Sequence, residues 1–115
     1  MALSVRRFAN ALVLGMAGRL DQDNCEAVRP DLMAHVKQAA HDGGAVVLDL
    51  SGLEYVSSAG LRCFMLASRQ AKAQHGRIAV AAMQPMVAEI FEISHFNLVF
   101  QVFPTVRDAL AAAST

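Results

Sequence analysis

The chain has 115 residues, of which 55% are hydrophobic, and its ten basic residues balance its ten acidic ones. That length suits one domain, residues 1–115, with a single core that needs neither disulfides nor a metal. The charges form no basic patch for nucleic acid, and no apolar run reaches the roughly 20 residues of a membrane span, so we expect neither partner directly.

The N-terminal segment predicts an antiparallel hairpin. Its strands would be Ser4 to Phe8 and Leu12 to Met16, with the turn at Ala9-Asn10, because Asn favours tight turns. Arg6-Arg7 before the apolar stretch Phe8 to Gly18 also imitates a twin-arginine or secretory signal. We favour the hairpin, because cleavage here would remove a strand and expose a sheet edge. We therefore expect a cytoplasmic protein, either a monomer or a weak homodimer through its edge strand.

A polar loop from Gly18 to Asn24 leads into the first predicted helix, since Asp and Asn are common helix caps. Pro30 falls inside the helical pattern and lacks a backbone N–H, so we expect either a kink there or a helix that starts only around Arg29. Asp42-Gly43-Gly44 supplies the helix end. One apolar stripe results, made of Cys25, Val28, Leu32, Val36 and Ala39.

The most informative stretch joins a buried strand to a helix. An apolar run from Val46 to Leu50, interrupted only by Asp49, is typical of a strand covered on both faces. Ser57-Ser58-Ala59-Gly60 then forms a tight turn into a helix that we expect to run from Leu61 to about His75 and to stop at Gly76. A serine at this turn either caps the helix or displays a modifiable hydroxyl, and local sequence alone favours the cap.

The helix after the serine turn has two distinct faces. One should pack on the sheet and contains Leu61, Phe64, Ala67 and Ala71. The other lines up Ser58, Arg62, Met65, Arg69 and Lys72 on an outward face. This second face is either a solvated basic surface or a docking surface for an acidic or amphipathic partner. An outward Met65 favours docking, because a flexible thioether suits an adaptable contact.

The remaining chain alternates strand and helix. We expect a strand over Arg77 to Ala82, a helix from Pro85 to near Ser94, and a last strand over Val99 to Phe103. Thr105 to Asp108 resembles a capping box that opens the final helix. The apolar side chains around the last strand, Phe96, Leu98, Phe100 and Phe103, should pack in the core. The pattern predicts an α/β fold with a mixed, mostly parallel sheet of four or five strands, an antiparallel N-terminal edge hairpin and four helices.

The sequence gives little support for a catalytic site or a metal site. The four histidines, His35, His41, His75 and His95, have no metal-ligand spacing and fall near helix ends or on outward faces. Neither Ser57 nor Ser58 has a histidine base that can be placed beside it, and the sequence contains no phosphate-binding glycine motif. Cys25 and Cys63 lack redox or zinc spacing and should be buried small hydrophobes. We expect no catalytic residue, metal or cofactor.

Two carboxylates qualify that expectation. Asp21 and Asp49 belong to segments that end at the same sheet edge, so both could approach the serine turn. Carboxylates beside a serine fit capping and a cation site equally well, and acid–base catalysis less well. The chain is therefore not expected to be an enzyme.

Three motifs resemble one known family. The stretch DLSGLEYVSSAGLR, which begins at Asp49, resembles the central motif of STAS domains, the anti-sigma factor antagonist family. Gly18-Arg19-Leu20-Asp21 resembles the family's motif before the first helix, and Met83-Gln84-Pro85 its turn before the third. The resemblance covers nearly the whole chain and implies the STAS fold.

The resemblance also implies site residues. Ser58 aligns with the residue that a partner anti-sigma factor, itself a serine kinase of the histidine-kinase-like ATPase fold, phosphorylates. Asp21 aligns with the family's loop aspartate that neighbours the serine, and Asn24 aligns with a polar residue that opens the first helix. Ser57 stands where the family often has aspartate, and Ala59 where it often has a second serine. The expected partner-binding residues are Asp21, Asn24, Ser57, Ser58, Ala59, Gly60, Arg62, Met65, Arg69 and Lys72.

The function that the resemblance implies is a phosphorylation-controlled switch in transcription. The unphosphorylated chain would bind the anti-sigma factor and release a sigma factor, phosphorylation of Ser58 would prevent binding, and a PP2C-type phosphatase would reverse the modification. The alternative is an accessory STAS subunit of a lipid or anion transport complex, or of a signalling complex, that works without phosphorylation. A serine at position 58, rather than a threonine, favours the switch.

Overall fold

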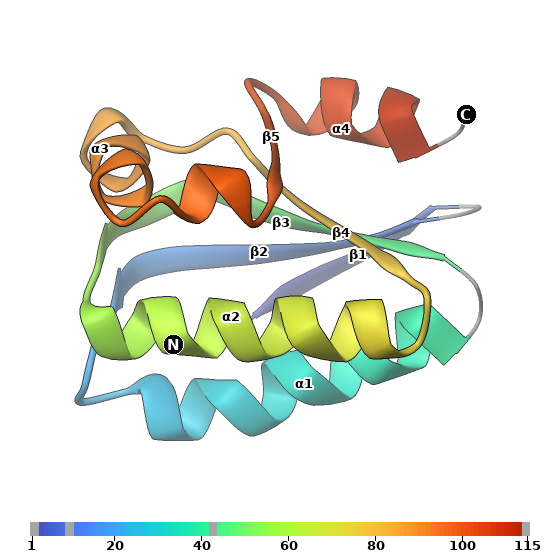
Figure 1. The fold of residues 1–115 in the computed structure, drawn as a ribbon, viewed down its shortest axis with the longest axis horizontal. Coiled ribbons are helices and arrows are strands. Elements are labelled where there is room, and N and C mark those ends of the chain that lie inside the picture. Colours follow the sequence, from blue (N-terminus) through green and yellow to red (C-terminus); the bar gives the residue numbers. More distant parts are fainter. Residues whose placement is uncertain (1–2, 9–10, 42–43, 114–115) are drawn as a thin grey trace.

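The computed structural model describes residues 3–8, 11–41 and 44–113, and these form a five-stranded sheet with helices on both sides (Figure 1). The sheet order follows the chain, with β1 antiparallel to β2 and every other neighbouring pair parallel. The strands are β1 (Ser4–Phe8), β2 (Ala11–Leu20), β3 (Ala45–Val56), β4 (Arg77–Ala81) and β5 (Gln101–Phe103). The helices are α1 (Cys25–His41), α2 (Ser58–Ala73), α3 (Pro85–Ile93) and α4 (Val106–Ala113), with a 3₁₀ turn, η1 (Phe96–Leu98), between α3 and β5. The predicted fold class and the N-terminal edge hairpin are confirmed.

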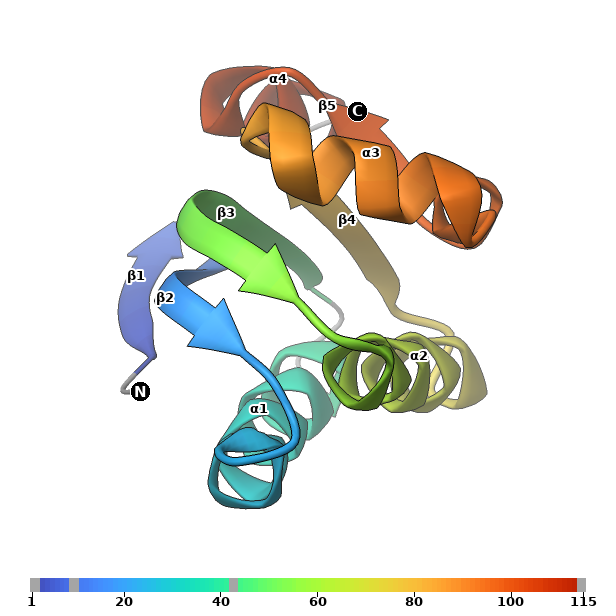
Figure 2. The same cartoon turned by 90° about the vertical axis from the view of Figure 1, so that its left-hand side faces the viewer.

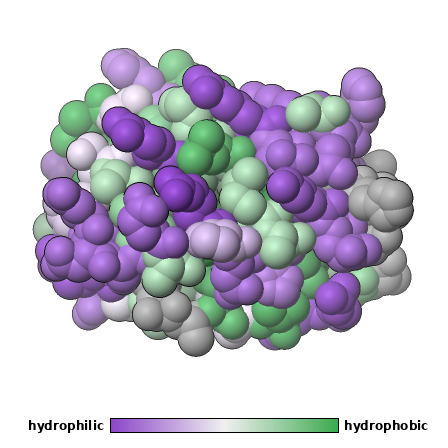
Figure 3. All heavy atoms as spheres, turned by 90° about the horizontal axis from the view of Figure 1, so that it is seen from below, coloured by the Kyte–Doolittle hydropathy of each residue, from purple (hydrophilic) through white to green (hydrophobic). Residues whose placement is uncertain are grey.

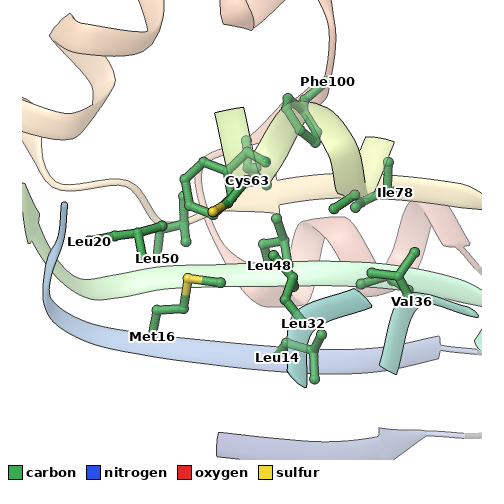
Figure 4. Close-up of a cluster of buried hydrophobic side chains, with 14 of the residues drawn as sticks. Leu14, Met16, Leu20, Leu32, Val36, Leu48, Leu50, Cys63, Ile78 and Phe100 are labelled. Atoms are coloured by element: carbon green, nitrogen blue, oxygen red, sulfur yellow. The ribbon is translucent and has the colours of Figure 1, made fainter. Parts of the chain in front are cut away.

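Helices cover both faces of the sheet. As drawn, α1 and α2 lie side by side below it, whereas α3 and α4 lie above it (Figures 1 and 2). Alternate residues of β3 therefore serve different cores: Leu48 packs with α1 and α2, and Val47 packs with α4. This double coverage explains the continuous apolar run in β3. Figure 4 shows part of the larger core, which contains buried side chains from β2, β3, α1 and α2.

The strand β2 is longer than expected. It continues past Met16 to Leu20, so the expected loop from Gly18 to Asn24 shrinks to the residues after Leu20. Pairing with β3 persists to Leu20 and Val56 through two register shifts, at Gly15/Ala17 and Gly18/Arg19. Gly18 has a φ of 81°, which glycine adopts without a steric cost. Bulges of this kind let the strand continue. The predicted turn at Ala9-Asn10 lies outside the described residues.

The helix α1 begins at Cys25, so of the two alternatives expected at Pro30, a kink or a later start around Arg29, the later start is wrong. Backbone amides of Cys25 and Val28 donate to the carbonyl oxygens of Asp21 and Asn24, which starts the helix ahead of Pro30. The stripe from Cys25 to Ala39 is buried, so packing on the sheet offsets the hydrogen bond that Pro30 removes. At the other end, the Gly44 amide donates to the Ala39 carbonyl oxygen at 3.0 Å. Asp42 and Gly43 lie outside the described residues.

The C-terminal part departs from expectation at four places. His75, with a φ of 59°, rather than Gly76, adopts the left-handed conformation after α2. The strand β4 ends at Ala81, because Ala82 also has a positive φ, of 60°. The last strand pairs with β4 over three residues only, and Leu98, expected in the core, is 79% exposed on η1.

The aromatic residues near the last strand, unlike Leu98, pack inward. The Phe91 ring lies 6.0 Å from Phe64, 5.9 Å from Phe96 and 6.2 Å from Phe100, between ring centroids. Phe103 packs on the smaller core beneath α4. The final helix begins as expected, because the Asp108 amide donates to the Thr105 hydroxyl at 3.1 Å. No helix within the described residues is long and apolar enough to cross a membrane.

Candidate functional site

The turn between β3 and α2 gives its two serines different roles. Ser57 is the N-cap of α2: its backbone is extended, and its hydroxyl accepts a hydrogen bond of 3.3 Å from the Gly60 amide. Ser58 is the first residue of α2 and is exposed, and no hydrogen bond joins its hydroxyl to another described residue. The two roles that the sequence left open thus fall on two neighbouring residues: a capping hydroxyl at Ser57 and a displayed hydroxyl at Ser58.

Backbone contacts hold this turn against the end of β2. The Ser57 amide donates to the Leu20 carbonyl oxygen at 2.9 Å, and the Leu61 amide donates to the Ser57 carbonyl oxygen at 2.8 Å. Gly60 is buried where a Cβ atom would lie 2.7 Å from the Leu20 carbonyl oxygen and 2.7 Å from Val56 Cγ2. Only glycine fits this approach without displacing backbone. The position of Ser58 is therefore fixed by the sheet edge.

The loop between β2 and α1 lies next to the serine turn, because Leu20 takes part in both. The Asp21 amide donates to Asn24 Oδ1 at 2.9 Å, and Asn24 Nδ2 donates to the Arg19 carbonyl oxygen at 2.7 Å. Asp21 Oδ1 accepts from the Asp23 amide at 3.0 Å. Asp21 and Asn24 therefore lie at the same edge as the serines, as expected, and both shape the loop through hydrogen bonds.

Sequence reasoning missed an interaction at this edge. The guanidinium of Arg19 lies 4.3 Å from the centre of the Tyr55 ring and 3.6 Å from the carboxylate of Asp21. Arg19 and Tyr55 face each other across the paired strands β2 and β3. Their proximity depends on a register that contains two bulges, so no spacing in the sequence could have revealed it. The loop around Asp21 gains a cation–π and an ionic contact.

The outward face of α2 is largely as predicted. Ser58, Arg62, Arg69 and Lys72 are exposed, whereas Met65 is half-buried. Ser58 and Arg62 also line a groove of about 440 Å³ against α1, whose rim includes Glu26 and Arg29. Met65, Arg69 and Lys72 are not among the lining residues of this groove. Figure 3 views the molecule from the side of α1 and α2 and shows a mainly hydrophilic surface with apolar patches between the polar residues.

Asp49 does not reach the serine turn. It lies within β3, opposite Gly15 of β2 and Ala81 of β4, and the strand continues to Val56. At about 3.3 Å per residue, eight residues of strand put Ser57 roughly 25 Å further along. The Asp49 carboxylate instead accepts from the Ser51 amide at 3.1 Å and pairs with Arg6 at 3.2 Å. The expected approach of two carboxylates to the serine is therefore wrong for Asp49.

His35, His75 and His95 lie on elements other than the serine turn. His35 lies 3.5 Å from Asp31 on α1, while His75 and His95 are exposed at positive φ beyond α2 and α3. His41 is the last residue of α1. Within the described ranges, no group of three or more His, Cys, Asp or Glu side chains could hold a metal ion.

The two cysteines are buried, as expected, but they are also neighbours. Cys25 begins α1 and Cys63 lies in the second turn of α2, and the Cys63 thiol donates to the Cys25 carbonyl oxygen at 3.8 Å. Burial, and next the neighbouring Cys25, raise the pKa of Cys63 above its ordinary value. A separation of 38 residues in the sequence gave no indication of this contact.

Comparison with known proteins identifies the family. A family model described as Mlab, STAS domain, matches residues 3–101. BtrV of Bordetella bronchiseptica, which is named as an anti-sigma factor antagonist, is 35% identical over 113 residues, covering 98% of this chain and 94% of that protein.

Solved structures agree on the fold. The crystal structure of TM1081 from Thermotoga maritima, also named as an anti-sigma factor antagonist, has a TM-score of 0.88 at 12% identity, with 98% of this chain and 95% of that chain covered. SpoIIAA of Bacillus matches in its unphosphorylated form with a TM-score of 0.72 at 20% identity, covering 95% of this chain and 93% of that one. Its phosphorylated form matches with a TM-score of 0.67 at 19% identity, covering 96% and 98%. The chain belongs to the STAS domain family of anti-sigma factor antagonists.

Proposed function

We propose that this chain, when unmodified, binds an anti-sigma factor that is also a serine kinase, and that phosphorylation of Ser58 abolishes the binding. The observation that carries the proposal is the division of roles at the turn. Ser57 caps α2, which leaves the exposed Ser58 hydroxyl unpaired among the described residues and available to a kinase. SpoIIAA, a protein of similar fold, has been solved both with and without phosphate, which supports a modification at such a fold.

The fold should tolerate a phosphate at Ser58. The group would add about two negative charges at the first residue of α2, where free backbone N–H groups and the helix dipole favour an anion. The Ser58 side chain is exposed, so the modification displaces no core packing. Arg62, one turn further along the same face, is a cation that could approach the phosphate. Phosphorylation therefore changes the surface and leaves the core intact.

The interface with the partner should not tolerate the same group. A doubly charged phosphate buried against an acidic or apolar partner surface loses its hydration, at a cost of several kcal/mol. Each 1.4 kcal/mol lowers affinity about tenfold, so binding falls by orders of magnitude. The partner-binding site in this proposal consists of Asp21, Asn24, Ser57, Ser58, Ala59, Gly60, Arg62, Met65, Arg69 and Lys72. Gly60 is buried and contributes by holding the turn in place.

The wider cycle follows from this switch. The partner kinase has the histidine-kinase-like ATPase fold, and a PP2C-type phosphatase restores the binding form. Capture of the anti-sigma factor by the unmodified chain releases a sigma factor in the cytoplasm and so changes transcription. In this cycle the chain is the substrate of two enzymes and has no catalytic role of its own.

Purified components test the proposal. The chain is incubated with Mg-ATP and a histidine-kinase-like anti-sigma factor from the same organism, and the product is mapped by mass spectrometry. One phosphate on Ser58 is expected, with none on a Ser58→Ala variant. Binding of Ser58→Asp is then compared with Ser51→Asp, which adds the same charge at an exposed position on β3, away from the turn. Equal binding by both variants and wild type, or capture of a transporter ATPase in place of the anti-sigma factor, would contradict the proposal.

A further inference from the structure

Cys25 and Cys63 lie next to each other where α1 and α2 lie side by side (Figure 1). Cys63 is labelled in Figure 4, among the buried side chains of the larger core. Both residues are free cysteines and are buried, with 8% of Cys25 and 3% of Cys63 exposed. The Cys63 thiol lies 3.8 Å from the carbonyl oxygen of Cys25, so the two residues are direct neighbours in the fold.

The pair lies within the candidate site. Cys25 and Cys63 line the groove of about 440 Å³ that Ser58, Ala59 and Arg62 also line. Cys25 follows Asn24 directly, and Cys63 follows Arg62 directly. The groove offers a small polar oxidant a path to sulfur atoms that are otherwise enclosed by the core. Any bond between the two sulfurs would therefore connect the loop around Asp21 to the helix that carries Ser58.

We propose that Cys25 and Cys63 are an oxidation site, at which a peroxide converts the two thiols into one disulfide that links α1 to α2. The Cys25 thiol gives up its proton, and its sulfur attacks a peroxide oxygen and becomes a sulfenic acid as the O–O bond breaks. The hydroxide that leaves takes up that proton, which gives the first water. The Cys63 thiolate then attacks the Cys25 sulfur, forms the S–S bond and expels hydroxide, which takes up a proton to give the second water. Two thiols and one hydrogen peroxide thus give one disulfide and two waters.

The order of attack follows from burial. Cys25 is the more exposed of the two and lines the groove at the start of α1, so peroxide reaches its sulfur first. Burial and the neighbouring Cys25 raise the pKa of Cys63, which makes Cys63 the less reactive of the two thiols toward peroxide. A bond formed in this way needs no large movement of the backbone, because the helices are already packed together.

The disulfide should weaken binding of the anti-sigma factor, an effect that rests on the proposed function. An S–S bond is about 2.05 Å long, shorter than the contact between two thiols, so its formation draws the start of α1 toward α2. Asp21 and Asn24 lie in the loop that leads into α1, and Ser58 and Arg62 lie in the first two turns of α2. A displacement between these two halves of the binding surface should lower the affinity several-fold.

The chemical step is tested on the reduced full chain with hydrogen peroxide, followed by alkylation and intact-mass measurement. Wild type should lose both alkylation sites together and regain them with dithiothreitol, and peptide mapping should show Cys25 joined to Cys63. The oxidised chain should also unfold at a higher temperature, because the bond closes a loop between residues 38 apart. Cys25→Ser and Cys63→Ser should instead stop at overoxidised sulfur or form a dimer between chains.

The regulatory step uses the same samples. Binding of the anti-sigma factor to the oxidised chain should be several-fold weaker than to the reduced chain, and dithiothreitol should restore it. Two unlinked, overoxidised cysteines in the wild type would overturn the oxidation site, and a disulfide that leaves the affinity unchanged would overturn its regulatory effect. Absence of binding by the reduced chain would contradict the proposed function instead, while the mass measurement would still decide the disulfide.

Discussion

The Ser57 amide donates a hydrogen bond of 2.9 Å to the Leu20 carbonyl oxygen, which ties the turn after β3 to the end of β2. This bond holds the loop after β2 and the serine turn after β3 at the same edge of the sheet, because Leu20 is fully buried and precedes Asp21. The serine turn is thus held by backbone as well as by side chains. The predictions that follow concern Gly60 and Ser57 in this turn, and Arg62 and Cys63 on the helix after it.

Replacement of Gly60 by alanine should destabilise the fold. The added Cβ would lie 2.7 Å from both the Leu20 carbonyl oxygen and Val56 Cγ2, so backbone must move. We expect a loss of about 1–3 kcal/mol in the free energy of unfolding, measured by denaturant titration. Ser58→Ala, at an exposed position two residues earlier, is the control and should change stability by less than about 0.5 kcal/mol. Equal stability of the two variants would mean that the turn can accommodate a Cβ atom at position 60.

Replacement of Ser57 by alanine should separate capping from modification. The variant loses the hydroxyl that accepts from the Gly60 amide, and a lost N-cap costs about 1 kcal/mol of stability. Ser58 stays in place, so the partner kinase should still phosphorylate it under conditions where the variant is folded. Thermal unfolding and phosphate incorporation are the two measurements. Loss of phosphorylation with unchanged stability would reverse the assigned roles of the two serines.

Replacement of Arg62 by glutamate should weaken partner binding while the fold is kept. Arg62 is exposed on the same face as Ser58 and lines the groove against α1. Reversing its charge should lower the affinity for the anti-sigma factor about tenfold or more, as measured by calorimetry. Arg107→Glu makes the same change on α4, on the other side of the sheet, and should have no effect. Parallel losses in both variants would point to a long-range charge effect in place of a local contact.

Stability should fall at alkaline pH, partly because of Cys63. The unfolded thiol ionises near 9.0, whereas burial and the neighbouring Cys25 raise the pKa in the folded chain. Above about pH 9 the unfolded chain therefore binds fewer protons than the folded one, so the free energy of unfolding decreases as pH rises. A Cys63→Ala variant should show a shallower decrease under reducing conditions. Identical slopes for the two proteins would show that Cys63 ionises normally when folded.

Much of the fold could be predicted from local patterns. The buried run in β3, the serine turn and the apolar stripes of α1 and α2 each follow from short-range spacing. The end of β2 could not be predicted, because two bulges keep its pairing with β3 going past Gly18. Leu98 was misplaced for a related reason: β5 is only three residues long, and the chain before it forms a 3₁₀ turn that directs Leu98 to solvent.

The candidate site was predictable in its residues but not in its contacts. Ser57 and Ser58 could be placed at the turn from the sequence. Their separate roles, however, depend on the hydrogen bond that the Gly60 amide donates to the Ser57 hydroxyl. The position of Asp49 was wrong, because the length of β3 beyond it determines its distance from the turn. The contact between Cys25 and Cys63 arises from helix packing across 38 residues, and only the folded chain reveals it.

The affinity of the anti-sigma factor for the chain phosphorylated on Ser58, compared with the unmodified chain, tests the central claim most directly. Both samples come from one preparation, with phosphate stoichiometry checked by intact mass and folding by circular dichroism. The account predicts that both are folded and that phosphorylation raises Kd by roughly 100-fold or more. Equal Kd values for two folded samples would contradict it.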